Sequence, residues 1–280
     1  MKITAAEDYE KVSKAIVCLF EANDKVGYLF EWLLKEEIDH HTKNAAINTL
    51  FREDSLRIKV LSNYFKLVGK HYLKRMLYPV IIEAKKPSKL SVNENGRHLA
   101  DLLMDQLANE TKLTCPDSIR VICEITKEET LKRTPHYLII ALGNLIFLRW
   151  ISPALIQPDS YGITDESPTI DERRVLLQTA KLIQTAVNAI CDTTIQQDEW
   201  CERMCARILS YLIRIPKRAD ELEFVYPSKN EKNLPEILEI YHEVKVLRDF
   251  QVQRLYRHVR LHIDEIEWVW KEVLTTPLPN

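Results

Sequence analysis

The chain has 280 residues, of which 46% are apolar and only 5 are glycine. The apolar share is enough for a sizeable core, and so few glycines argue against a strand-rich protein with many turns. The net charge of −2, from 39 basic and 41 acidic residues, gives neither an overall basic field for nucleic acid nor a polybasic segment for an anionic membrane. We therefore expect an all-α protein.

Apolar residues at spacings of three and four predict amphipathic helices over 7–20 and 26–38. A third helix begins after Asp54 or Ser55, either of which can cap it, and is expected to stop near Gly69. Between the second and third helices lies TLFREDSL (49–56), with Arg52 at the tip of a short loop. Hydrophobic neighbours on both sides make this loop a rigid platform for that side chain.

The segment 85–96 is expected to be a loop, followed by helices at about 97–111, from Pro116 to about 132, and from Pro135 to Pro153. The last of these is apolar nearly all round, which predicts the most buried helix of the chain. A proline-rich connection (152–172) precedes a helix over 173–190. The sequence then predicts a loop at 225–235 and a long helix over 241–274.

The six cysteines lie scattered in helical, mostly apolar surroundings and do not form a disulfide framework, which favours a reducing compartment. The N-terminus has no charged-then-apolar leader, so we expect no signal peptide. No uninterrupted run of 18 apolar residues occurs, so we expect no membrane span. The cysteines are Cys18, Cys115, Cys123, Cys191, Cys201 and Cys205.

Arg149 stands inside the apolar run that ends GNLIFLRWISPALIQP. A buried guanidinium without partners is very costly, so Arg149 must meet backbone carbonyls or carboxylates. On its own this would indicate only a structural ion pair. The following helix adds a stripe of one cation and two amides, which is either an ordinary wet face or a surface for a partner's loop. Its members are Lys181, Gln184 and Asn188.

Several of these segments, in this order, resemble the catalytic domain of GTPase-activating proteins for Ras-type small GTPases (RasGAP). TLFREDSL is similar to the finger loop of that family, and FLRWISPALIQP (147–158) to its FLR-x-x-x-PA-x-x-x-P signature. AKLIQTAVN (180–188) resembles the helix that contacts the GTPase. NENGRHLADLL (93–103) and CPDSIRVIC (115–123) are most similar to neurofibromin-like members. The similarity covers roughly residues 30–220.

The resemblance implies a RasGAP-type helical domain with central catalytic helices and accessory helices from both termini. It divides the chain into accessory helices (1–28), a catalytic core (29–221) and C-terminal accessory helices (222–280). Arg52 falls on the arginine finger, which enters the nucleotide site of a bound GTPase, and Arg149 on the residue that holds the finger loop. The resemblance implies that a further set of residues contacts the partner or supports the contact: Thr49, Leu50, Phe51, Lys181, Gln184, Asn188, Pro153 and Ala154. Of these, Pro153 and Ala154 are expected to end the buried helix and line the floor of the groove.

By the same resemblance the chain activates a GTP-bound Ras-family GTPase and is not an enzyme with a complete active site of its own. It needs no cofactor or metal, since GTP and magnesium belong to the partner, and it contains no Gly-rich phosphate loop. We expect a cytoplasmic domain that binds neither nucleic acid nor membrane directly, with any membrane recruitment coming from regions outside this chain.

Three positions depart from the family's usual pattern: Trp150, Ser152 and Leu177. These departures, and a short stretch between finger and signature, leave open whether the partner is Ras, Rap or another relative. One alternative is an IQGAP-like scaffold that binds a GTPase without accelerating hydrolysis, but such relatives lack the finger arginine that Arg52 supplies. A helical adaptor without GTPase contact is the other alternative.

The remaining candidate sites are weaker. His258 and His262 form an i,i+4 pair that could bind a metal, but no third or fourth ligand is near in the sequence. Cys201 and Cys205 form a similar pair with the same shortfall. The pair His40–His41 fits a helix C-terminus, where histidines interact favourably with the helix dipole.

Overall fold

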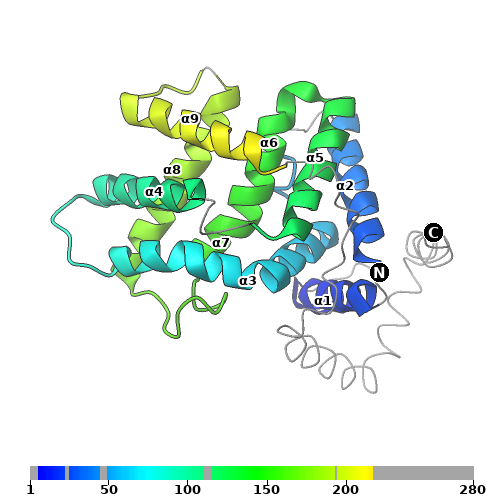
Figure 1. Cartoon of the computed structure of the whole chain (residues 1–280), viewed down its shortest axis with the longest axis horizontal. Helices are drawn as coiled ribbons and strands as arrows, with labels where there is room; N and C mark the ends of the chain where they lie inside the picture. The colour runs from blue at the N-terminus through cyan, green and yellow to red at the C-terminus, as the bar shows by residue number, and fades with distance from the viewer. Residues whose placement is uncertain (1–5, 23–24, 45–48, 110–114, 193, 217–280) are drawn as a thin grey trace. The chain divides into compact units, whose positions relative to one another are not determined.

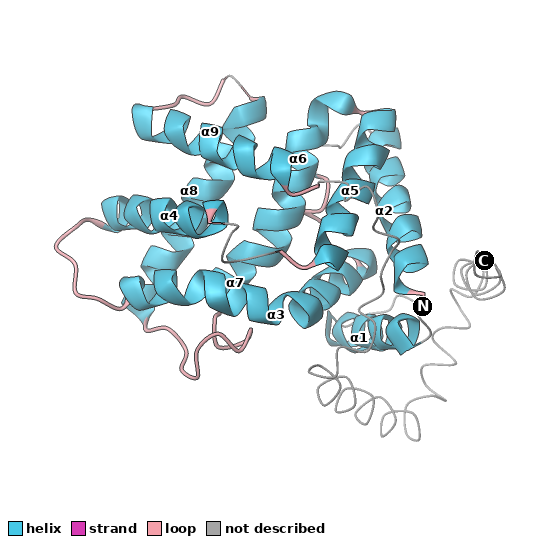
Figure 2. Cartoon of the chain, viewed as in Figure 1, coloured by secondary structure: helices cyan, strands magenta, loops and turns pink. Residues whose placement is uncertain are grey.

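A computed structural model describes residues 6–22, 25–44, 49–109, 115–192 and 194–216. Every regular element in these ranges is helical, as Figures 1 and 2 show, which confirms the all-α prediction. The expected loop at 225–235, the helix at 241–274 and the His258–His262 pair lie outside the described residues. The helices are α1 (Ala6–Ala22), α2 (Val26–Lys43), α3 (Leu56–Ala84), α4 (Val92–Ala108), α5 (Asp117–Arg133), η2 (Pro135–Tyr137), α6 (Leu138–Gly143), η3 (Asn144–Ile151), α7 (Ser152–Ile156), α8 (Ile170–Cys191) and α9 (Glu199–Arg214).

The chain forms two compact units. The first contains α1 and the opening turns of α2 and α3; there Asn63 Nδ2 donates to Ser13 Oγ at 2.7 Å. Ser55 caps α3 in this unit, because its Oγ accepts from the Ile58 amide at 3.3 Å, which confirms one of the two predicted caps. The second unit comprises 34–54 and 64–222 and contains every residue for which a finger or partner-contact role is predicted.

Helix α8 is the central element of the second unit. It packs most extensively along α4 and also contacts α6, η3, α7 and α9 (Figure 1). Its apolar stripe, including Leu176, Ile183 and Val187, is buried. Gly143 lets α6 approach closely, since a Cβ there would lie 2.3 Å from Val187 Cγ1. Helix α8 is thereby held close against the α6–η3 run.

Several predicted boundaries are wrong, those of α4 and α3 among them. Helix α4 begins at Val92, not near 97, because Ser91 and Glu94 form a capping box in which each side chain bonds the other's backbone amide. Helix α3 does not stop near Gly69 but continues to Ala84, even across Pro79. The cost of a helical glycine is offset by packing, because Gly69 is where the indole of Trp150 lies against the helix.

Trp150, one of the departures from the family pattern, fills the space that Gly69 leaves. It is fully buried, stacks on Tyr72 with ring centroids 5.4 Å apart, and tilts against Phe65 at 5.6 Å. A Cβ at Gly69 would stand 2.6 Å from the indole Nε1, which is closer than real Cβ contacts allow. The large indole of Trp150 and the absence of a side chain at Gly69 are therefore complementary.

We expect Gly69→Ala to lower the free energy of unfolding by about 1–3 kcal/mol, since the rigid indole must shift to admit the methyl group. Gly96→Ala is the matched comparison and should cost less, because the Cβ there meets Gln178 Cγ at 3.0 Å and Leu182 Cδ1 at 3.2 Å, which need a smaller shift than a rigid indole at 2.6 Å. Urea denaturation measures both. Combining Gly69→Ala with Trp150→Phe should cost less than the sum of the single changes, and strict additivity would show that the two residues do not share this space.

The run from Pro135 to Ile156 is the most apolar part of the described chain. By length and composition this run could cross a bilayer, although the lack of an uninterrupted run of 18 apolar residues predicted no membrane span. However, 67% of its most apolar window is buried inside the fold. This burial confirms the predicted core helix. The run does not end at Pro153 as expected, because α7 carries it to Ile156.

Candidate functional site

The site is built around the finger loop, which we define as residues 49–54. Leu50 and Phe51 are fully buried, whereas Thr49, Arg52 and Glu53 are exposed. The Arg52 amide donates to the Thr49 carbonyl at 2.8 Å, which closes a tight turn. Phe51 has φ +61°, a conformation that a bulky L-residue rarely adopts and that costs about 1–3 kcal/mol. The surroundings must therefore hold this turn in place.

Arg149 supplies part of that support. Its Nε donates to the Phe51 carbonyl, and its Nη2 donates to the Glu53 carbonyl at 3.0 Å. One planar guanidinium thus grips the loop on both sides of Arg52. Burial lowers the pKa of Arg149, while the carboxylates of Asp54 and Glu37 act in the opposite direction. The prediction that a guanidinium in this apolar run must meet carbonyls or carboxylates is confirmed.

Asn144 is a support that the sequence analysis missed. It is fully buried, and its Nδ2 donates to the Leu50 carbonyl at 2.9 Å. Together Asn144 and Arg149 hold three carbonyls of the finger loop. An isolated asparagine in an otherwise apolar run, five residues before Arg149, was the signal that could have identified it.

The helical geometry explains how both side chains reach the same loop. Segment η3, which runs from Asn144 to Ile151, is a π-helix. In an α-helix residues share a face at spacings of three and four, so residues five apart diverge. In a π-helix, whose hydrogen bonds join residues five apart, two residues at that spacing lie nearer to the same face than in an α-helix, and such segments are frequent at functional sites. The π-helical segment therefore aims Asn144 and Arg149 together at the finger loop.

The end of α2 lies beneath the loop. His41 is fully buried, and its Nδ1 is 2.9 Å from the Glu37 carbonyl oxygen one turn earlier, as expected for a histidine at a helix C-terminus. Its Nε2 lies 3.7 Å from the Glu53 carboxylate. Contacts from α2 and from η3 therefore meet at the finger loop.

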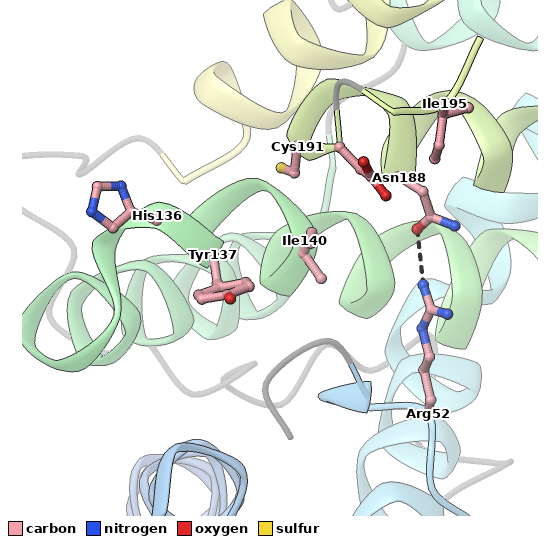
Figure 3. A pocket seen from close by; sticks show the side chains of 8 residues that line it. Arg52, His136, Tyr137, Ile140, Asn188, Cys191 and Ile195 are labelled. Atoms are coloured by element: carbon pink, nitrogen blue, oxygen red, sulfur yellow. Dashed lines mark hydrogen bonds between the residues drawn. The ribbon is translucent and has the colours of Figure 1, made fainter. Parts of the chain in front are cut away.

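The amide stripe on α8 joins the same network. Gln184 Nε2 donates to Asn144 Oδ1 at 3.0 Å and to Asn188 Oδ1 at 3.3 Å. Asn188 Oδ1 also accepts from Arg52 Nη2 at 2.8 Å, the dashed line of Figure 3. Residues from the loop, η3 and α8 thus form one continuous hydrogen-bonded set.

Other residues of the predicted site lie outside this set. Lys181 is exposed on α8, one turn before Gln184. Pro153 is half-buried in α7, and Ala154 is fully buried, so in this structure Ala154 packs inside the fold and offers no surface to a partner. The expectation that these two residues end the buried helix is wrong, since a proline is tolerated in the first turn of α7.

A hollow of about 440 Å³ opens beside the network (Figure 3). Arg52 and Asn188 form one wall. Tyr137 and Ile140 contribute an apolar wall, and Asp192 and Cys191 lie at the end of α8. An exposed guanidinium next to a partly apolar hollow is an arrangement that can receive an anionic group and an adjoining segment of another protein.

The cysteines form no disulfide, as expected: all six are free. Burial raises the pKa of the Cys205 thiol to about 12, and its Sγ donates to the Ala186 carbonyl at 3.4 Å. Cys205 therefore has the character of a packed structural thiol.

Comparison with known proteins shows what these elements are similar to. Residues 94–188 match the RasGAP family model, described as GTPase-activator protein for Ras-like GTPase. The matched range includes Asn144, Arg149 and the amides of α8; Arg52 lies upstream of it. The matched segment and the all-helical fold support a neurofibromin-like RasGAP domain.

Three relatives illustrate the similarity. The chain is 29% identical over 65% of its length to the probable Ras GTPase-activating-like protein ngap of Dictyostelium discoideum. It is 26% identical over 78% to the inhibitory regulator protein IRA2 of Saccharomyces cerevisiae, and 24% identical over 65% to neurofibromin-A of Dictyostelium discoideum. It spans only 22%, 8% and 23% of their respective lengths.

Proposed function

We propose that this chain, which contains a RasGAP domain, accelerates GTP hydrolysis by a Ras-family small GTPase through an arginine finger, Arg52. The observation that carries the proposal is a single exposed arginine at the tip of a loop whose backbone is held at Leu50, Phe51 and Glu53. A rigid loop delivers a side chain at lower entropic cost than a mobile one. The relatives' names, which describe Ras GTPase activators, support the same conclusion.

The chemistry requires an arginine at this point. During phosphoryl transfer, negative charge develops on the γ-phosphate oxygens and at the leaving oxygen, and the catalyst acts by positioning and electrostatic stabilisation. An always-charged, forked donor meets several phosphate oxygens at once, which a lysine cannot do. The Phe51 and Glu53 carbonyls are occupied by Arg149, so the loop keeps its shape while Arg52 extends to the partner.

The division of labour follows from this geometry. The chain supplies the arginine in trans and completes an active site that lies in the GTPase. GTP and magnesium come bound to the partner, so we propose no resident cofactor. Lys181 and the exposed face of α8 would contact the GTPase beside the finger loop.

The test is single-turnover GTP hydrolysis by a panel of Ras, Rap and related GTPases, each loaded with GTP and mixed with excess chain. Acceleration of at least one member supports the proposal and identifies the partner. Binding to a GTP-loaded GTPase without acceleration would overturn it and leave the scaffold. Absence of both acceleration and binding across the panel would also overturn it.

A further inference from the structure

The side chain of Arg52 is exposed, yet its guanidinium is docked. Nη2 donates at 2.8 Å to Asn188 Oδ1, an acceptor 136 residues away on α8 (Figure 3). An exposed arginine carries about 2 kcal/mol of rotamer entropy and holds one position only if its acceptor is itself fixed. The position of the Asn188 amide therefore decides whether this contact is incidental.

The Asn188 amide is fixed by a circuit of hydrogen bonds. Gln184 donates to Asn188 Oδ1 and to Asn144 Oδ1, and Asn144 donates to the Leu50 carbonyl. Leu50 is two residues before Arg52, so the circuit starts and ends in the finger loop. The oxygen that receives the guanidinium is thus presented by the same groups that hold the loop backbone.

The docked side chain lies along the wall of the hollow and is bonded to its own protein. To stabilise phosphoryl transfer, the guanidinium must give its donors to phosphate oxygens of a partner. An amide oxygen is a neutral acceptor, and hydrogen bonds to charged acceptors are about twice as strong. A phosphate can therefore displace Asn188, whereas a carboxylate at the same place would compete with it.

We infer that Asn188 is a releasable dock for the arginine finger: it holds Arg52 against α8 in the free protein and gives it up to the partner's phosphate. The inference rests on the proposed function. Asn188 is a positioning residue, acting only through Arg52. The Asn188 amide carries no charge, and this property makes the dock releasable.

The test compares Asn188→Asp and Asn188→Ala by single-turnover hydrolysis at saturating chain, with affinity measured separately. We expect Asn188→Asp to lower the maximal rate about tenfold, because the carboxylate retains the guanidinium. Asn188→Ala, which removes the acceptor without adding a charge, should lower the maximal rate much less than Asn188→Asp does. In an Arg52→Ala background, Asn188→Asp should have no further effect on that rate. Arg203→Ala, which changes the net charge by the same amount on an exposed side chain of α9, is the matched control.

Two outcomes would overturn the dock. One is a loss in Asn188→Ala as large as in Asn188→Asp, which would make Asn188 a required contact in its own right. The other is an Asn188→Asp effect that persists without Arg52. NMR of the Arg52 guanidinium in the free chain reads the dock without any GTPase: rotation about its Nε–Cζ bond should be faster in Asn188→Ala and slower in Asn188→Asp. Unchanged rotation in both would refute the dock even if the chain activates no GTPase.

Discussion

Replacing Arg52 with alanine is expected to remove most of the acceleration of GTP hydrolysis while the chain stays folded and still binds its partner. The loss should be about 10³- to 10⁵-fold, a range adopted from measured arginine fingers, the Ras–activator pair among them, and not calculated from this structure. The fold should be unaffected, since the side chain is exposed and its hydrogen bond to Asn188 lies at the surface. Single-turnover hydrolysis gives the rate, and titration with a GTP-analogue complex gives the affinity.

The controls separate the finger from a general loss of positive charge. Arg52→Lys should recover little, because an ammonium is a point charge and lacks the planar fork. Arg203→Ala, which removes an exposed arginine of α9 paired with Glu199, should leave the rate unchanged. If Arg52→Ala keeps more than a tenth of the wild-type rate, Arg52 is not the principal source of the acceleration.

Periodicity and capping residues predicted most of the helices of the described chain. Ser55 marks the start of α3 because its Oγ accepts from a backbone amide of the first turn, and Pro116, which has no N–H to leave unpaired, stands directly before α5. The prediction that α3 stops near Gly69 was wrong because a glycine can either end a helix or make room for a large neighbouring side chain. Only the position of Trp150 in the folded protein decides between these two roles. Sequence spacing does not contain that information.

The candidate site was predictable in part. Burying an arginine demands partners, so the position of Arg149 implied acceptors before the structure identified them as the Phe51 and Glu53 carbonyls. The role of Asn144 was not predictable, because it depends on the π-helical turn that turns it toward the loop together with Arg149. Similarly, nothing in the spacing of α8 indicates that Asn188 meets Arg52 rather than solvent.

Replacing Arg149 with alanine is expected to slow hydrolysis with little change in affinity. The change deletes two charge-assisted hydrogen bonds to the finger loop and frees the strained Phe51 turn to relax. If about 2–3 kcal/mol of loop positioning is lost, the single-turnover rate falls roughly 30- to 150-fold. Thermal and urea unfolding should show a loss of about 1–2 kcal/mol, because the two carbonyls lose their donors.

The effect of Arg149 should depend on Arg52, because Arg149 acts only by holding the loop that carries it. In an Arg52→Ala background, Arg149→Ala should therefore reduce the rate little further, although it should still lower stability by the same amount. Arg149→Lys should fall between wild type and alanine, since one ammonium can reach one of the two carbonyls. A rate loss that is equally large with and without Arg52 would mean that Arg149 contacts the partner itself, and the clamp on the finger loop would not be its function.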